Sequence, residues 1–78
     1  MPPLHPIPAK RLVKILLYLG FQNIRIRGSH HFFFNPITRK TTTIPIHGNE
    51  SLSIGILKEI LRDIEISSEE YETLRRSI

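Results

Sequence analysis

The sequence predicts an α+β domain in which a three-stranded antiparallel sheet carries its helices on one face. Apolar residues recur with helical spacing near both ends of the chain, and three short extended segments follow one another between them. The links between those segments are short, which favours antiparallel pairing. A chain of 78 residues builds one small core, so the helices must share one face of the sheet and leave the other open.

The chain begins with a proline-rich arm and a helix. Residues 1–8 hold four of the six prolines, and we expect this arm to lie extended along the surface. Leu12, Leu16 and Leu19 form an apolar stripe over residues 9–19. Gly20 stands where a glycine usually ends a helix.

Three extended segments follow the first helix. Residues 21–27 alternate apolar and cationic at their end, residues 30–34 are aromatic, and residues 40–46 are rich in Thr and Ile. Gly28-Ser29 has the composition of a two-residue hairpin turn. Pro45 predicts that the third segment lies at a sheet edge or stops there.

Two helices complete the predicted fold. Ser53 is the expected cap of a helix with apolar residues at helical spacing, which are Leu57, Ile60, Leu61 and Ile64. Ser67 and Glu70 have capping-box spacing before a short last helix. Double-stranded-RNA-binding domains have this order of elements. We expect an arm at 1–8, a domain at 9–66 and an appended helix at 67–78.

Charge is unevenly distributed along the chain. Residues 1–49 hold seven basic side chains and no acidic one, whereas residues 50–78 hold four basic and seven acidic ones. A stretch without carboxylates suits contact with a polyanion, because acidic groups would repel phosphates. An ordinary solvated surface of lysine and arginine is the alternative interpretation.

Composition also excludes some classes of protein. The chain has no cysteine, which rules out disulfides, thiolate metal sites and a cysteine nucleophile. The most apolar stretch is too short to span a membrane, and the first residues do not form a secretory signal. We therefore expect a cytoplasmic protein without a membrane partner.

The turn at Gly28-Ser29 determines which side chains share the open face. Arg27 then lies opposite His30, and directly opposed residues point to the same side. The side chains expected on the open face are Arg25, Arg27, His30, Phe32 and Phe34. Those expected on the core face are Ile24, Ile26, His31 and Phe33. A turn longer by one residue would exchange His30 for His31.

An imidazole between two guanidinium groups suits cleavage of RNA without a metal. RNA carries its own nucleophile, the 2′-hydroxyl, so a nuclease needs a base, cationic donors for the phosphorane and an acid for the leaving oxygen. Histidine exchanges protons near neutral pH. A hydrogen bond within the turn, or stacking on a base without catalysis, is the alternative for His30.

The other histidines have less specific interpretations. We expect His31 to face the core or to hydrogen-bond, and His5 to be solvated in the arm. His47 is expected to be structural, but it is the leading candidate for a second acid or base, followed by His31. A zinc site from these residues is not expected, because adjacent strand residues diverge.

Several side chains are candidates for RNA contact. Phe32 or Phe34 on an open sheet face suits stacking on a base, although a partner protein or a second copy could cover such rings equally well. Lys10, Arg11 and Lys14 on the first helix suit phosphate contacts, with a solvated helix face as the alternative. The complete expected set is Lys10, Arg11, Lys14, Arg25, Arg27, Gly28, Ser29 and Phe32.

Two sequence blocks resemble the HicA family of mRNA interferase toxins. The first is Gly28-Ser29-His30, after a basic helix that ends in Gly20-Phe21. The second is Ile44-Pro45-Ile46-His47, followed by Glu50, Leu52, Gly55, Leu57 and Ile60-Leu61. The resemblance covers residues 9–66, and Ile56 stands where the family usually has threonine.

The resemblance implies a fold similar to the double-stranded-RNA-binding domain and ribosome-independent cleavage of mRNA. It implies no metal and no organic cofactor, and growth arrest that a HicB-type antitoxin relieves. The family's catalytic histidine maps to His30. A non-catalytic RNA-binding module on the same sheet, and an interaction domain that faces an acidic protein, remain the competing hypotheses.

Overall fold

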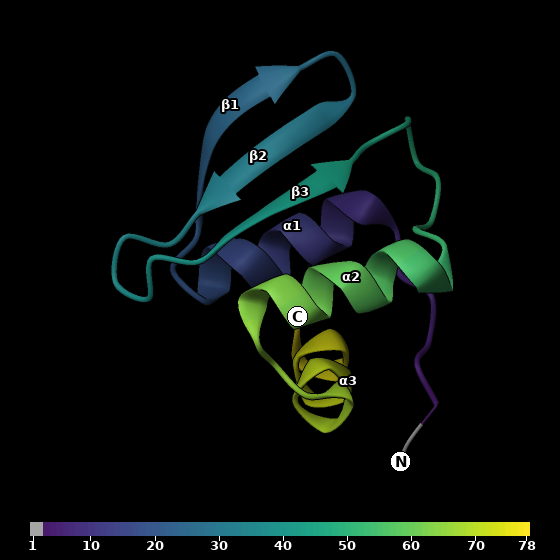
Figure 1. Ribbon diagram of the computed structural model, residues 1–78. Helices are drawn as coiled ribbons and strands as arrows, with labels where there is room; N and C mark the ends of the chain where they lie inside the picture. Colours follow the sequence, from purple (N-terminus) through teal and green to yellow (C-terminus); the bar gives the residue numbers. More distant parts are fainter. Residues whose placement is uncertain (1–2) are drawn as a thin grey trace.

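The computed structural model describes residues 3–78 and has the predicted α+β architecture. The elements in chain order are α1 (Ala9–Tyr18), β1 (Gln22–Arg27), β2 (His30–Phe34), β3 (Thr41–Pro45), α2 (Ile54–Ile64) and α3 (Ser68–Ser77). Figure 1 shows the three strands as one layer and the helices as a second layer below it. None of the helices described is long and apolar enough to cross a membrane.

The sheet is antiparallel with the strand order β1-β2-β3, so β2 lies in the centre. The two-residue turn joins β1 to β2, and Gly28 has a φ of 61°, which glycine adopts without strain. Arg27 pairs with His30 and Arg25 with Phe32. The predicted hairpin register is therefore confirmed.

The helices begin and end as their sequences indicate. Gly20 follows α1 with a φ of 99°. The Ser53 hydroxyl accepts a hydrogen bond from the Ile56 backbone N–H at 3.2 Å, and the Ser67 hydroxyl accepts one from the Glu70 N–H at 3.0 Å. Each serine satisfies one of the amide donors that a helix start leaves without an intrahelical partner.

The core lies between the sheet and the helix layer. Phe33 of β2 and Ile44 of β3 are buried on the inward face of the sheet. Thr42, on the same face, donates a hydrogen bond from its hydroxyl to Asp63 of α2 at 3.0 Å. These contacts bring α2 against β3, and no helix or strand among residues 3–78 covers the opposite face of the sheet.

The prediction that Ile24 and Ile26 belong to the core is wrong, although Ile26 does point to the same side of the sheet as buried Ile44. All six residues of β1 are exposed, and these two side chains are 58% and 60% exposed. β1 is an edge strand, whereas α1 and α2 pack against β3 at the other side of the sheet. A bulge between Asn23 and Arg25 also shifts the pairing at Ile24. β1 therefore extends beyond the helix layer.

The arm is more than a surface segment, which corrects a second expectation. Ile7 is 1% exposed, and its carbonyl accepts a hydrogen bond from the Leu52 N–H at 3.0 Å. The Ala9 N–H donates to the Glu50 carbonyl at 3.2 Å. The first two residues of the expected arm lie outside the described residues. The arm thus fills part of the core beside the loop that precedes α2.

Candidate nucleic-acid interface

His30 is the first residue of the central strand and lies on the open face of the sheet. Its register partners are Arg27 on β1 and Pro45 on β3. The imidazole is exposed, so it is accessible to a ligand. The fold therefore presents a histidine beside an arginine at one end of an uncovered sheet face.

Arg25 and Phe32 form the next step along the open face. The Cζ atom of Arg25 lies 5.7 Å from the centroid of the Phe32 ring, within the range of a cation–π contact. Arg25 is exposed and Phe32 is half-buried. An aromatic ring beside a guanidinium group combines a surface for stacking with donors for a phosphate.

A third pair, which the sequence analysis missed, lies at the far end of β2. The Cζ atom of Arg39 is 5.9 Å from the centroid of the Phe34 ring. Phe34 was expected on the open face, but Arg39 was not singled out because it belongs to the loop between β2 and β3. Asn35-Pro36, a turn-forming dipeptide directly after the strand, was the available signal.

Asn35 builds the loop that carries Arg39. It is 3% exposed, and its side-chain oxygen accepts hydrogen bonds from the N–H groups of Ile37 at 2.9 Å and Thr38 at 3.2 Å. Its side-chain NH₂ donates to the Leu19 carbonyl at 3.1 Å, which ties the loop to the end of α1. The Arg39 N–H donates to the Asn35 carbonyl at 2.7 Å.

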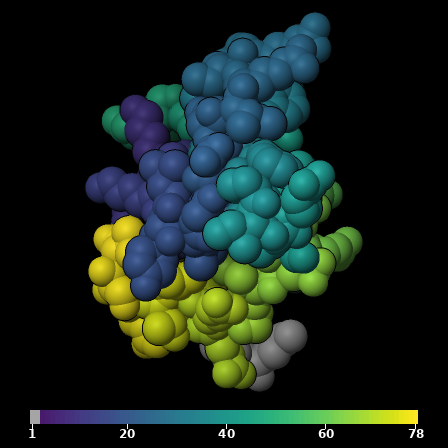
Figure 2. Space-filling view, turned by 90° about the vertical axis from the view of Figure 1, so that its left-hand side faces the viewer, coloured from purple at the N-terminus to yellow at the C-terminus, as the bar shows by residue number. Residues whose placement is uncertain are grey.

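Figure 2 shows how these elements lie on one side of the molecule. The β1–β2 hairpin (blue) stands out at the top, and the loop of residues 35–40 (teal) lies below it on the right. β2, which carries His30, Phe32 and Phe34, runs from the hairpin turn to this loop.

His31 lies on the opposite face of the sheet from His30. Its register partners are Ile26 and Ile44, and its Nδ1 atom is 3.3 Å from the side-chain nitrogen of Asn23. The ring is half-buried. The fold therefore separates the two neighbouring histidines.

His47 lies at the same end of the sheet as His30. It comes two residues after Pro45, the register partner of His30, and the Ile46 N–H donates to the Ser29 carbonyl at 2.8 Å. His47 is exposed and lines a cavity of about 160 Å³ together with Pro45 and Glu50. The rest of this lining comes from the loop before α2 and from the first turn of that helix.

The basic residues of α1 belong to the helix layer and do not join the open face of the sheet. Lys10 donates from Nζ to the Asn49 side-chain oxygen at 3.4 Å. Arg11 donates from its guanidinium to the Arg75 carbonyl at 2.8 Å, so this group holds α3. Lys14 is exposed. Sequence reasoning placed all three in one RNA-binding set, but the fold gives them different surroundings.

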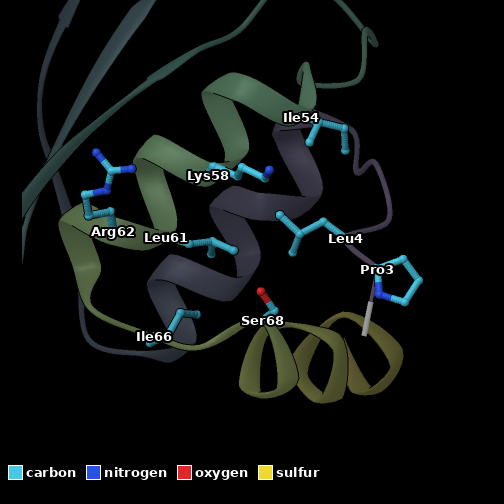
Figure 3. A pocket seen from close by; sticks show the side chains of 8 residues that line it. All are labelled: Pro3, Leu4, Ile54, Lys58, Leu61, Arg62, Ile66 and Ser68. Atoms are coloured by element: carbon cyan, nitrogen blue, oxygen red, sulfur yellow. The ribbon is translucent and has the colours of Figure 1, made fainter. Parts of the chain in front are cut away.

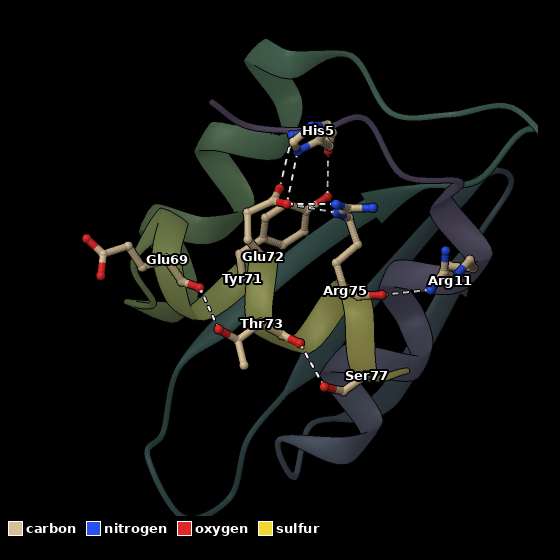
Figure 4. A network of polar contacts seen from close by, with 8 residues as sticks. All are labelled: His5, Arg11, Glu69, Tyr71, Glu72, Thr73, Arg75 and Ser77. Carbon is tan, nitrogen blue, oxygen red and sulfur yellow. Dashed lines mark hydrogen bonds and ion pairs between the residues drawn. The ribbon is translucent and has the colours of Figure 1, made fainter. Parts of the chain in front are cut away.

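A dense polar network fastens the arm to α3, away from the open face (Figure 4). Tyr71 donates from its hydroxyl to the His5 carbonyl at 2.7 Å. The carboxylate of Glu72 accepts from the His5 N–H at 3.1 Å and from Arg75 at 2.8 Å, and it lies 2.9 Å from the His5 ring. The expectation that His5 is solvated fits its exposed side chain, but its backbone N–H and its ring also contact Glu72.

Two of the groups whose pKa values this network shifts are Glu72 and Tyr71. Hydrogen bonds from Arg75, assisted by those from His5, lower the pKa of Glu72 to about 2. Burial, assisted by the charge of Glu72, raises the pKa of Tyr71 to about 12. Both groups thus remain in their ordinary charge states over a wide pH range, which suits a structural contact.

A second cavity, of about 430 Å³, lies between the arm, α2 and the start of α3 (Figure 3). Leu4, Leu61 and Ile66 give it an apolar lining, and Lys58 and Arg62 also line it. It belongs to the helix layer and adds nothing to the open face. Within residues 3–78, no three histidine, cysteine or acidic side chains are grouped as metal ligands would be.

Comparison with known proteins adds the family. Residues 9–66 match the family model described as the HicA toxin of bacterial toxin–antitoxin systems. The match includes the hairpin with His30, the whole sheet and α2. No curated protein matches the chain. Since most of the chain is matched, it belongs to the HicA toxin family, whose members are known as mRNA interferases.

Proposed function

We propose that this HicA toxin cleaves mRNA in the cytoplasm without a metal ion and that His30 is its general base and acid. The observation that carries the proposal is the position of His30. It is exposed on the open face and directly opposite Arg27, and Arg25 lies one step further along the same face. Residues 9–66 are the proposed catalytic and RNA-binding domain.

The proposed reaction uses the nucleophile that RNA itself provides. His30 removes the proton from a 2′-hydroxyl, and the resulting oxygen attacks the adjacent phosphorus atom. Arg27 and Arg25 stabilise the negative charge of the phosphorane by hydrogen bonds from their guanidinium groups. The bond from phosphorus to the 5′-oxygen then breaks, and that oxygen takes up a proton.

The proton for the leaving oxygen comes from a second group or from His30 itself. His47 is the preferred second group, because it is exposed at the same end of the sheet. His31 is a weaker candidate, since it lies on the other face beside Asn23. Gly28 and Ser29 form the turn that holds the hairpin in register, and they are proposed as RNA contacts beside His30.

The expected partner is an antitoxin, and we propose one of the HicB type. Exposed β1 and the open face supply the surface that such a protein would have to cover to keep RNA away. Lys10 and Lys14 are proposed as phosphate contacts outside the sheet. Arg11 is less well suited to RNA, because its guanidinium already binds the Arg75 carbonyl.

The test compares the purified wild-type chain with His30→Ala and His47→Ala. In buffer with EDTA, we expect wild-type protein to cut mRNA and His30→Ala to be at least ~100-fold slower, the usual scale of a lost acid–base group. Circular dichroism should show an intact fold, because His30 is exposed. A smaller loss in His47→Ala would assign that residue the proton donation.

The outcome that contradicts this proposal is equally specific. If the wild-type chain binds RNA in a salt-dependent manner but leaves it intact, the protein is a non-catalytic RNA-binding module. If cleavage stops in EDTA and returns with a divalent cation, the metal-free route is wrong. Full activity of His30→Ala would remove His30 from the mechanism.

A further inference from the structure

The open face of the sheet holds a repeated arrangement along β2. Side chains of His30, Phe32 and Phe34 point to the same side, because strand residues alternate between faces. Phe32 is paired with Arg25 and Phe34 with Arg39. A row of three positions therefore runs from the hairpin to the loop, with a cation beside each.

We propose that this row is a track for single-stranded RNA and that Phe34 with Arg39 is a separate nucleotide subsite, two positions from His30. The inference rests on the proposed function in one respect, which is that RNA is the ligand. The subsite would hold one base on the Phe34 ring and a neighbouring phosphate on the Arg39 guanidinium.

The spacing of the row favours a single strand. Residues two apart on a strand are about 7 Å apart. Stacked bases in one strand of a duplex rise only about 3.4 Å each. Bases that occupy Phe32 and Phe34 at the same time must therefore be separated from one another, which a flexible single strand permits and a continuous duplex does not.

The position of Arg39 is built by the fold. Its φ is 66°, in the left-handed region that glycine and asparagine normally occupy. Its loop is fixed from inside by buried Asn35. The ammonium group of the neighbouring Lys40 lies 3.2 Å from the carboxylate of Glu65, directly after α2, whereas the guanidinium of Arg39 lies over the Phe34 ring. An arginine in a backbone conformation that suits glycine indicates a use for its side chain.

Arg39→Gly tests the subsite without damage to the loop, because glycine is the residue that this φ favours. The probe is a fluorescent single-stranded RNA with 2′-O-methyl groups, which removes the nucleophile and separates binding from cleavage. Oligonucleotides of stepwise increasing length are compared by fluorescence anisotropy. We expect Arg39→Gly to bind the longer ones about tenfold more weakly and the shortest one as wild type does.

The matched control is Arg76→Ala, which removes one positive charge from the exposed surface of α3. It should change affinity by less than about twofold at moderate salt, since its effect on the sheet is only long-range. Arg39→Lys should give an intermediate loss, because the charge stays but the planar group is absent. Equal effects of Arg39→Gly and Arg76→Ala would overturn the subsite.

The two proposals fail in different ways. If the wild-type chain cuts mRNA and Arg39→Gly binds every oligonucleotide normally, the subsite is wrong and the proposed function stands. If the Arg39 dependence is present but wild-type protein never cuts RNA, the track stands and catalysis by His30 is wrong. If a duplex of the same sequence shows the same dependence on Arg39, the assignment to single strands is wrong.

Discussion

At the scale of single residues, Asn35 has the widest influence on the site. One buried side chain organises the loop, joins it to the end of α1 and so determines where Arg39 lies. Alanine would remove three part-buried hydrogen bonds, two from the Ile37 and Thr38 N–H groups and one to the Leu19 carbonyl. We expect Asn35→Ala to lower the free energy of unfolding by about 2 kcal/mol in urea denaturation.

Comparison with Arg39→Gly separates the effect of Asn35 on stability from its effect on RNA affinity. Asn35→Ala should lose stability and RNA affinity together, whereas Arg39→Gly should lose affinity alone. An Asn35→Ala protein with wild-type stability would show that the loop does not depend on these hydrogen bonds.

Part of the open face could be predicted from the sequence at this scale. The pairs Arg27–His30 and Arg25–Phe32 were predictable, because a two-residue turn fixes the register of the hairpin. The position of Arg39 could not be predicted. Its contact with Phe34 depends on the left-handed backbone conformation of Arg39 itself and on a hydrogen bond from Asn35 to Leu19. Neither feature has a periodic signal.

At the scale of elements, the serine caps are the simplest features to test. Ser67 caps α3, and Ser68 is the first residue of that helix. Ser67→Ala should reduce the free energy of unfolding by about 1 kcal/mol, because the Glu70 N–H loses its acceptor.

Ser68→Ala is the matched control, with the same atom removed one residue later. We expect its urea midpoint to stay close to that of the wild-type protein. Equal losses in the two variants would mean that the cap contributes nothing beyond the general effect of the substitution.

The strands show what alternation can and cannot predict. For β2 the alternation predicts the buried face correctly, since Phe33 is 1% exposed. For β1 the same rule fails, because Ile24 and Ile26 alternate like core residues and yet lie beyond the helix layer. The sequence of a strand does not indicate whether the helix layer extends far enough across the sheet to cover that strand.

At the scale of the whole molecule, the network of the arm and α3 predicts how stability depends on pH. Glu72 has a pKa of about 2 in the folded chain against an ordinary value of 4.5. Its ionised form therefore stabilises the fold above about pH 4.5, and this contribution is lost as the pH falls toward 2. We expect Glu72→Gln to flatten that acid limb in melting temperatures measured against pH.

Tyr71 is expected to cause a loss of stability at alkaline pH, and it serves as an internal control for Glu72. Its pKa is raised from 10.0 to about 12, so its contribution is present below pH 10 and is lost as the pH rises toward 12. Tyr71→Phe should flatten the alkaline limb and leave the acid limb unchanged. An acid limb that persists in Glu72→Gln would mean that other carboxylates cause it.

No local pattern could have predicted this network. Tyr71 and His5 are 66 positions apart in the sequence, and Glu72 and His5 are 67 apart. Helical spacing identified α3 and its cap, and the prolines identified the arm. That the two segments bind each other follows only from the finished fold, which places the arm between α2 and α3.

The contact between the arm and α3 joins the first and the last parts of the chain to be synthesised. A ribosome makes His5 early and Tyr71, Glu72 and Arg75 late, after every strand of the sheet has already been added to the chain. The arm consequently has no partner in α3 while the sheet is being synthesised. A nascent chain can thus display the His30 hairpin before its first and last segments have closed on each other, and α3 can bind the arm only after Tyr71, Glu72 and Arg75 have left the ribosome.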